Sequence, residues 1–187
     1  MLKRILAAGA LGGVVLMLWA FVANGIFGFT SRMRMGRIPD ERAVYLVLKE
    51  HIREPGLYIA NPEPVPDVGF PEGEPVFAVH YAGMGHEAAG RLLFVEPAWA
   101  FLSTLLAAAL LSMTSERVLS RYARRVLFLV LVGFLLALWG NLTRYGIGGY
   151  PLGAALLLAA NDLAAWAAAG LAMAWPMRTR AGTEAAA

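Results

Sequence analysis

The run ILAAGALGGVVLMLWAFVANGIFGF, residues Ile5–Phe29, contains no charged side chain and decides the fold class. A helix needs about 20 apolar residues to cross the roughly 30 Å hydrocarbon core of a bilayer. Three further apolar runs lie at Phe94–Met113, Val126–Leu142 and Leu152–Trp175. The pattern therefore predicts four transmembrane helices, with residues 1–29 as the first of them.

Composition supports the same class. The chain has 187 residues, of which 59% are hydrophobic, against roughly 45–50% in a soluble domain. It has no cysteine, which excludes disulfides, thiolate metal sites and cysteine nucleophiles. The first run is longer than the roughly 7–15 residues of a signal peptide's apolar core. Phe21-Val22-Ala23 also offers no small-residue cleavage site. We interpret the run as an uncleaved anchor rather than a signal peptide.

Arginine placement predicts the orientation. Short loops rich in Lys and Arg stay in the cytoplasm, whereas long loops largely escape this rule. The loop Thr114–Arg125 carries four arginines and one acid, and both chain ends are basic. We expect both termini on the cytoplasmic side of a bacterial inner membrane, residues 30–93 outside it and 176–187 as a cytoplasmic tail. Three arginines that directly follow the first span argue against this orientation: Arg32, Arg34 and Arg37.

The polar block 30–93 predicts a small mixed lobe. Asp40–Ile52 has helically spaced apolar residues and an aspartate cap, so it predicts a short helix. Leu57–Ala60 and Val76–Tyr81 are typical of strands, and the proline-rich segment between them predicts an extended connector. The expected fold is an integral membrane, mainly α protein: a four-transmembrane-helix bundle with a small α+β extracytoplasmic lobe between helices 1 and 2.

Prolines and tryptophans indicate where the spans begin and end. Pro97 follows Glu96, a pair typical of a helix's first turn, where the missing N–H costs nothing and a carboxylate meets the positive end of the dipole. Trp166 lies deep in its run and predicts packing. The tryptophans near span ends predict anchors at the membrane interface: Trp19, Trp99, Trp139 and Trp175.

Asp162 is the most informative single residue. It lies about midway along the last run, beside Asn161, with no base in the same run. A carboxylate at the bilayer centre costs roughly 2.5–3.5 kcal/mol on insertion scales, so it usually faces the bundle and serves a purpose. One interpretation is a proton or cation site. The other is an acid that joins helices, with Asn161, Ser103 or Thr104 as partners. Proton pathways normally relay several acids, so the structural interpretation is favoured.

Small residues predict close helix contacts. Ala155, Ala159, Ala165 and Ala169 share a helix face with Asp162. A second row is formed by Ala160, Ala164, Ala168 and Ala172, and the first run contains Gly9-x-x-x-Gly13. Such rows let helices approach closely, either inside the bundle or between copies of the chain. Packing inside the bundle is the favoured interpretation.

Two further polar groups lie near span ends. Asn24, Asn141 and Arg144 are expected near the outer ends of their helices, where they form a polar cluster beneath the lobe or bond to loop backbone. At the opposite end, Arg117, Arg121 and Arg125 are four apart and predict a cationic stripe. Together with Arg124 they are expected to contact anionic lipid headgroups, each contributing about 1 kcal/mol. So short a segment does not indicate nucleic-acid binding.

No catalytic constellation is found in the sequence. The only conceivable metal ligands are His51, His80 and His86 with Glu87. His86-Glu87 begins like the zinc-protease motif H-E-x-x-H, but Gly90 stands where the second histidine is required. We therefore expect no enzyme activity, no metal and no cofactor.

Three stretches resemble a family of small four-span bacterial inner-membrane proteins without an assigned activity. They are the glycine-rich start from Leu2 to Phe21, the element Glu54-Pro55-Gly56-Leu57-Tyr58, and Tyr150-Pro151 followed by Asp162 and Ala169-Gly170-Leu171. The resemblance implies the architecture and no activity.

The favoured function is a non-enzymatic accessory or assembly protein of the bacterial envelope, acting through helix–helix and lobe contacts. Its expected partners are the lipid bilayer and other membrane proteins or further copies of itself. The alternative is a small proton- or cation-coupled carrier that uses Asp162, and a membrane enzyme ranks third.

Overall fold

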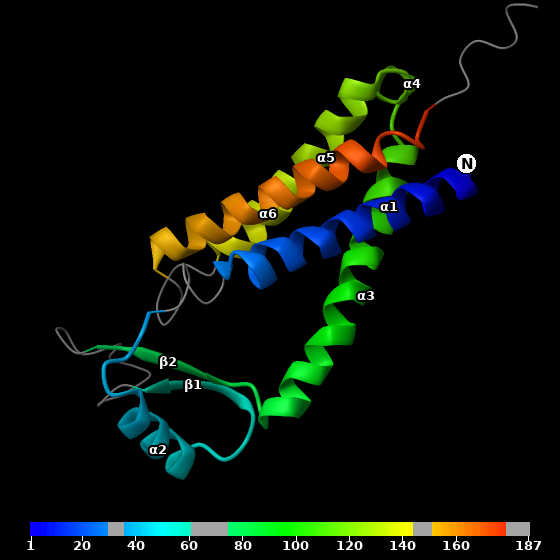
Figure 1. The fold of residues 1–187 in the computed structure, drawn as a ribbon. Coiled ribbons are helices and arrows are strands. Elements are labelled where there is room, and N and C mark those ends of the chain that lie inside the picture. Colours follow the sequence, from blue (N-terminus) through cyan, green and yellow to red (C-terminus); the bar gives the residue numbers. More distant parts are fainter. Residues whose placement is uncertain (30–35, 61–74, 144–150, 179–187) are drawn as a thin grey trace, which may run out of the picture.

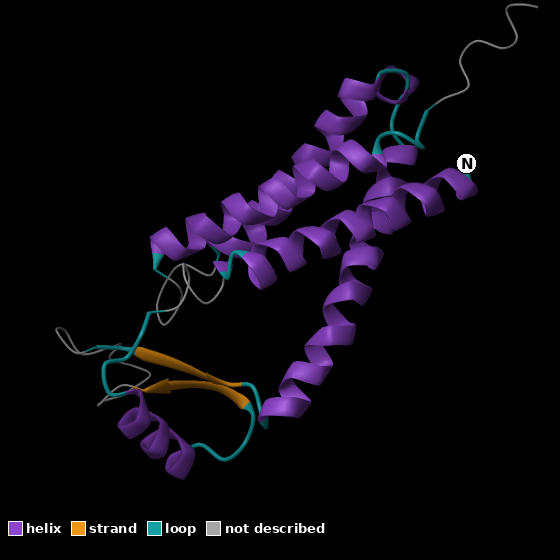
Figure 2. Ribbon diagram, viewed as in Figure 1, coloured by secondary structure: helices purple, strands orange, loops and turns teal. Residues whose placement is uncertain are grey.

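The computed structural model describes residues 1–29, 36–60, 75–143 and 151–178, with the side chains of 86–94 excepted. Helices dominate the described chain, and one antiparallel hairpin accompanies them (Figure 2). Along the sequence the elements are α1 (Leu2–Ala20), η1 (Phe21–Ile26), α2 (Glu41–His51), β1 (Gly56–Ala60), β2 (Phe77–Tyr81), α3 (Gly85–Ser112), α4 (Glu116–Leu119), α5 (Tyr122–Ala137), η3 (Leu138–Leu142) and α6 (Leu152–Met173).

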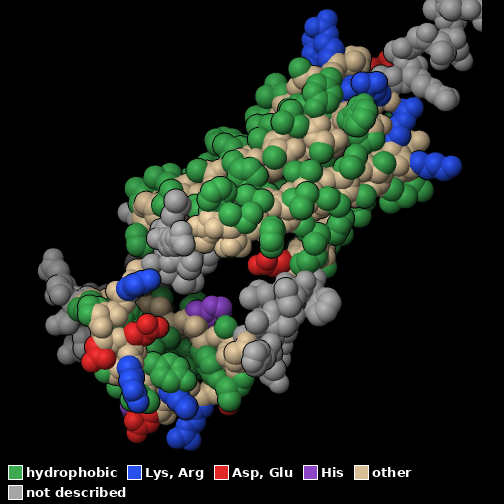
Figure 3. Space-filling view, in the orientation of Figure 1, with side chains coloured by type: hydrophobic (Ala, Val, Ile, Leu, Met, Phe, Trp, Pro, Cys, Tyr) green, Lys and Arg blue, Asp and Glu red, His purple; other side chains and the backbone are tan. Residues whose placement is uncertain are grey.

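Four helices in the described chain are long and apolar enough to cross a membrane: Leu2–Ile26, Val95–Ser112, Tyr122–Leu142 and Leu152–Met173. This confirms the four predicted helices and indicates a multi-pass membrane protein. The first and third spans each combine an α-helix with a final π-helical segment, η1 and η3. Much of their surface is apolar and exposed, as a lipid-facing surface must be (Figure 3).

The spans form a bundle in which α1, α5 and α6 run side by side (Figure 1). Helix α6 packs between α1 and α5, and α3 packs mainly on α1. From that crossing α3 continues away from the other three helices towards the hairpin (Figure 1). The buried core joins Leu111 of α3, Leu129 of α5 and Met173 of α6.

Helix α3 begins much earlier than its apolar run. The run starts at Phe94, whereas the helix starts at Gly85. The sequence of these first turns includes Glu87 and Arg91, so hydropathy alone places the start of the span later than the start of the helix. Pro97 consequently lies inside the helix and not in its first turn, which corrects the expectation for that residue. There it removes a main-chain donor from the helix interior.

The described part of the predicted lobe contains α2, β1, β2 and the first turns of α3, which begins at Gly85. Asp40 caps α2, since its Oδ1 accepts from the Ala43 amide at 3.2 Å. The two strands pair antiparallel, with Gly56 opposite Tyr81 and Ala60 opposite Phe77. Helix and strands thus confirm the short elements expected from the sequence. None of the residues in α2, β1 and β2 is fully buried.

Candidate functional site: a polar network between helices

Asp162 lies in the middle of α6 and accepts two amide hydrogen bonds. Asn141 Nδ2, from η3 at the end of the third span, donates to Oδ2 at 2.8 Å. Asn161 Nδ2, from the same helix, donates to Oδ1 at 3.4 Å. Asn141 is only 4% exposed, while Asp162 and Asn161 are half-buried. The carboxylate therefore connects the third and fourth spans.

The network extends to the first span through Trp19. Its indole Nε1 donates to Asn161 Oδ1 at 3.1 Å. An indole N–H withdrawn from water usually finds such a partner. The chain of bonds Trp19–Asn161–Asp162–Asn141 joins three spans. Within lipid, hydrogen bonds of this kind and close packing hold helices together, because the surrounding tails are as apolar as the side chains.

Helix geometry explains why Asn141 reaches Asp162. Gly133, Ala137 and Asn141 are four residues apart, and all three are buried. At Gly133 an added Cβ would lie 2.2 Å from Trp166 Cβ of α6, so the third and fourth spans touch almost backbone to backbone. η3 continues the third span beyond this contact, so Asn141 lies on the same buried face as Gly133 and Ala137. π-Helical turns are often found at functional sites.

The first and second spans are joined in the same two ways, by a hydrogen bond and by close packing at glycines. Thr104, fully buried on α3, donates its hydroxyl to the Gly9 carbonyl oxygen of α1 at 2.8 Å. Cβ atoms added at Gly9 and Gly13 would lie 2.5 Å from Leu105 Cδ2 and 2.3 Å from Phe101 Cδ1. The predicted glycine pair in the first span therefore serves packing inside the bundle.

The alanine rows of α6 differ in burial. The row that shares the face of Asp162 packs inside the bundle, with Ala155 and Ala169 fully buried. In the second row Ala160 is exposed, and Ala164, Ala168 and Ala172 are half-buried. Internal packing thus accounts for the first row.

The structure regroups the predicted polar residues. Asn161 is a partner of Asp162 as expected, but Ser103 and Thr104 bond to carbonyl oxygens instead. Asn141, predicted in an outer cluster with Asn24 and Arg144, bonds to Asp162. Asn24 lies in η1 with an exposed side chain, and Arg144 is outside the described residues. The three-residue cluster therefore stays a prediction.

Trp19 and Asn141 were the members of the network that sequence reasoning did not connect to Asp162. Trp19 was expected to be an interfacial anchor, and it instead donates within the bundle. The four-residue spacing of Gly133, Ala137 and Asn141 was the available signal for Asn141. The other expected anchors are exposed, whereas Trp166 is buried as predicted. Those anchors are Trp99, Trp139 and Trp175.

The arginine-rich end differs from the expected stripe. Arg121 has an extended backbone conformation between α4 and α5, so Arg117, Arg121 and Arg125 do not share one helix. Arg125 is 3% exposed, which corrects its expected contact with lipid headgroups. Arg117 and Arg121 are exposed, and Arg124 is half-buried and donates to the Arg117 carbonyl oxygen at 2.8 Å.

Arg125 donates hydrogen bonds to carbonyl oxygens at the ends of two helices. Its Nε donates to the Ala174 carbonyl oxygen at the end of α6, at 2.9 Å, and its Nη1 donates to the Leu119 carbonyl oxygen at the end of α4. The Tyr122 hydroxyl donates to the Leu171 carbonyl oxygen at 2.8 Å. Terminal helix carbonyls lack partners within their own helix and carry the negative end of the dipole. A buried cation is accommodated there for that reason.

Within the residues that the structure describes, no three His, Asp or Glu side chains are grouped as a metal site would require. His51 and His80 have exposed side chains, and the side chains of His86 and Glu87 lie outside the described part.

No protein-family model matches the sequence, and comparisons with curated proteins and with solved structures give no match. The resemblance to small four-span bacterial proteins therefore stays a prediction.

Proposed function

We propose that the chain is an accessory or assembly protein of the bacterial cytoplasmic membrane, which holds other membrane proteins through its lobe and helices. The observation that carries the proposal is the pair of hydrogen bonds that Asp162 accepts from Asn141 and Asn161. In the four spans the only other Asp or Glu is Glu96, at the start of the second span. A carboxylate with two amide partners and no second acid to relay protons suits a role in joining helices.

The lobe supports a role in binding other proteins. Its described elements bury no side chain completely, and several of its large apolar residues are exposed. They include Ile38, Tyr45, Leu46, Val47, Leu57, Ile59 and Phe77. A two-stranded hairpin is at best marginally stable by itself, and α2, β1 and β2 contain no fully buried residue that would form a core between them. Burial of these residues against a partner would supply the apolar contact that the described elements of the lobe do not supply to one another.

The proposed orientation has both termini in the cytoplasm and the lobe on the outer side. The hydrogen bonds of Arg4, Arg124 and Arg125 gather the basic chain start, the loop between the second and third spans, and the end of α6 at one end of the bundle. Short basic segments remain cytoplasmic. A reporter active only outside the cytoplasm should work when fused at Val68 and fail at Ser120 or after Arg180. The reverse pattern would place the lobe in the cytoplasm.

Crosslinking tests the binding role directly. A photoreactive amino acid at Leu57, which is 74% exposed on the lobe, should give discrete protein adducts in living cells. The same photoreactive residue at Leu131, exposed on α5, serves as the matched position within a span, where adducts report contacts of the helices and not of the lobe. Absence of lobe adducts at normal expression, with an intact protein, would contradict the proposal.

A small proton- or cation-coupled carrier is the second candidate. One observation favours it: Asp162 is half-buried and has no Lys or Arg partner in the described chain. If this acid titrates during transport, the Asp162→Asn variant should lose a pH-dependent property of the wild-type protein while its stability is kept. Uptake of protons or cations into proteoliposomes under an imposed pH gradient measures this property.

A further inference from the structure

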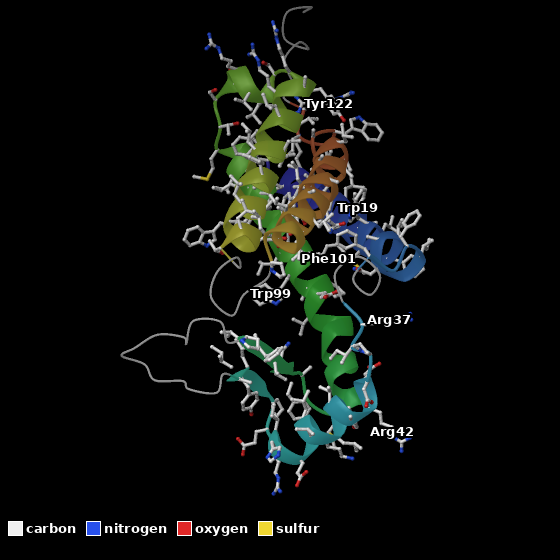
Figure 4. The ribbon with its side chains drawn as sticks, turned by 90° about the vertical axis from the view of Figure 1, so that its left-hand side faces the viewer. Trp19, Arg37, Arg42, Trp99, Phe101 and Tyr122 are labelled. Carbon is white, nitrogen blue, oxygen red and sulfur yellow. The ribbon has the colours of Figure 1, made fainter. Side chains whose placement is uncertain are left out.

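Basic side chains gather at the end of the bundle that is opposite the lobe (Figure 3). Figure 4 shows Tyr122 at this end, far from Arg37 and Arg42 of the lobe. The sequence near this end offers a single described acid, Glu116. The described basic residues here are Lys3, Arg4, Arg117, Arg121, Arg124, Arg125 and Arg178.

Three of these cations meet at the end of α6. Arg4, from the start of α1, donates through Nη1 to the carbonyl oxygen of Arg178. Arg125, from α5, donates to the carbonyl oxygen of Ala174, four residues earlier. Arg178 itself follows the end of α6, and its positive charge acts unfavourably on that of Arg125. Three separate segments therefore contribute one guanidinium each.

The partial negative charge at the end of α6 is too small to balance three cations. A helix C-terminus carries the equivalent of about half an elementary charge. In the described part of the chain, no carboxylate forms an ion pair with Arg4, Arg125 or Arg178. Towards the described residues, Arg125 donates hydrogen bonds through its Nε and one Nη, although a guanidinium has five N–H donors. Within the described residues, no anion balances the three cations.

Neighbouring side chains indicate the chemistry of that anion. Four exposed apolar residues lie close in sequence to Arg4 or Arg178: Leu2 and Leu6 on α1, Leu171 on α6 and Trp175 just after α6. A ligand that places a phosphate on the arginines and acyl chains on these apolar residues is a phospholipid. We propose that Arg4 and Arg178 bind the phosphate of an anionic phospholipid, while buried Arg125 holds the end of α6 in position.

The proposal does not depend on the accessory function, because it concerns the bilayer and not a protein partner. The test uses the full-length protein in a neutral detergent, with phosphatidylglycerol titrated in mixed micelles and phosphatidylcholine as the zwitterionic comparison. Bound lipid is counted by native mass spectrometry, and thermal unfolding is followed in parallel. We expect saturable retention of phosphatidylglycerol with a rise in the unfolding temperature, and neither effect with phosphatidylcholine.

The matched variants distinguish binding at this site from an effect of the protein's net charge. Each base near a lipid surface strengthens binding about fivefold, so Arg4→Gln with Arg178→Gln should weaken retention of phosphatidylglycerol about thirtyfold. Arg37→Gln with Arg42→Gln removes the same charge from the lobe and should leave retention unchanged. Arg4→Lys with Arg178→Lys keeps the charge and should restore most of the binding, which also controls for folding.

Three results would overturn the proposal. Equal retention of the two lipids by the wild-type protein would show that no anion is recognised. Equal loss in both Gln variants would show that only net charge matters. Equal stabilisation by millimolar inorganic phosphate would make the ligand a soluble anion instead of a lipid.

Discussion

Gly133→Ala tests the closest contact in the bundle. Its added Cβ would lie 2.2 Å from Cβ and 2.7 Å from Cγ of Trp166, whereas ordinary van der Waals contact begins near 3.4 Å. The third and fourth spans would have to separate by about 1 Å locally. Because the clash is with Trp166 Cβ, which hardly moves relative to the backbone, no rotamer change relieves it.

The expected cost follows from two opposing terms. Overpacking of this kind costs about 1–3 kcal/mol. Alanine is favoured over glycine in a helix interior by about 1 kcal/mol, which offsets part of that cost. Gly140→Ala and Gly153→Ala are matched controls, since no atom lies within 4 Å of a Cβ added at either position. We expect Gly133→Ala to be less stable than either control by about 1–3 kcal/mol.

Reversible unfolding in mixed micelles, by titration with a denaturing detergent, measures this difference. The separation of the two spans should also weaken the bond between Asn141 and Asp162, which lies two helical turns away along the same contact. If Gly133→Ala unfolds at the same detergent fraction as Gly140→Ala, the close approach of α5 and α6 is wrong, and the proposed geometry of the network fails with it.

Three further outcomes are expected. Asp162→Asn should keep its bond to Asn141 and the wild-type stability. Asp162→Leu should lose about 0.6 kcal/mol, and at most about 1.7 kcal/mol, in the same unfolding assay, which are the average and the maximum for hydrogen bonds between membrane helices. Equal loss in both variants would contradict the network. Thr104→Val should lose a similar amount, because it removes the donor to the Gly9 carbonyl oxygen, while Ser103→Ala, which removes only bonds to its own helix, should lose less. The excised fragment 30–90 should show no cooperative thermal transition by circular dichroism, since α2, β1 and β2 bury no side chain completely; a sharp transition would identify an autonomous domain.

The sequence was sufficient for several features that depend mainly on neighbours along the chain. Span number follows from the length of apolar runs, which is a local property, and four spans are found. The cap of α2 at Asp40 and the two short strands are likewise local, because side-chain capping and β propensity act over a few residues. The early start of α3 was missed because hydropathy detects the apolar part of a helix and not its polar turns.

Only the tertiary structure decided which polar groups meet. Asp162 was identified from its position, but its bond to Asn141 depends on how η3 passes α6, and Arg125 was expected at the surface and is buried at two helix ends. The physical reason is that lipid and the bundle interior are equally apolar, so composition does not distinguish the two faces of a membrane helix. Gly9, Gly13 and Gly133 lie on the packed face, where neighbouring helices leave no room for a Cβ, whereas Gly140 and Gly153 face open space, so only the tertiary structure tells which glycines mark a helix contact.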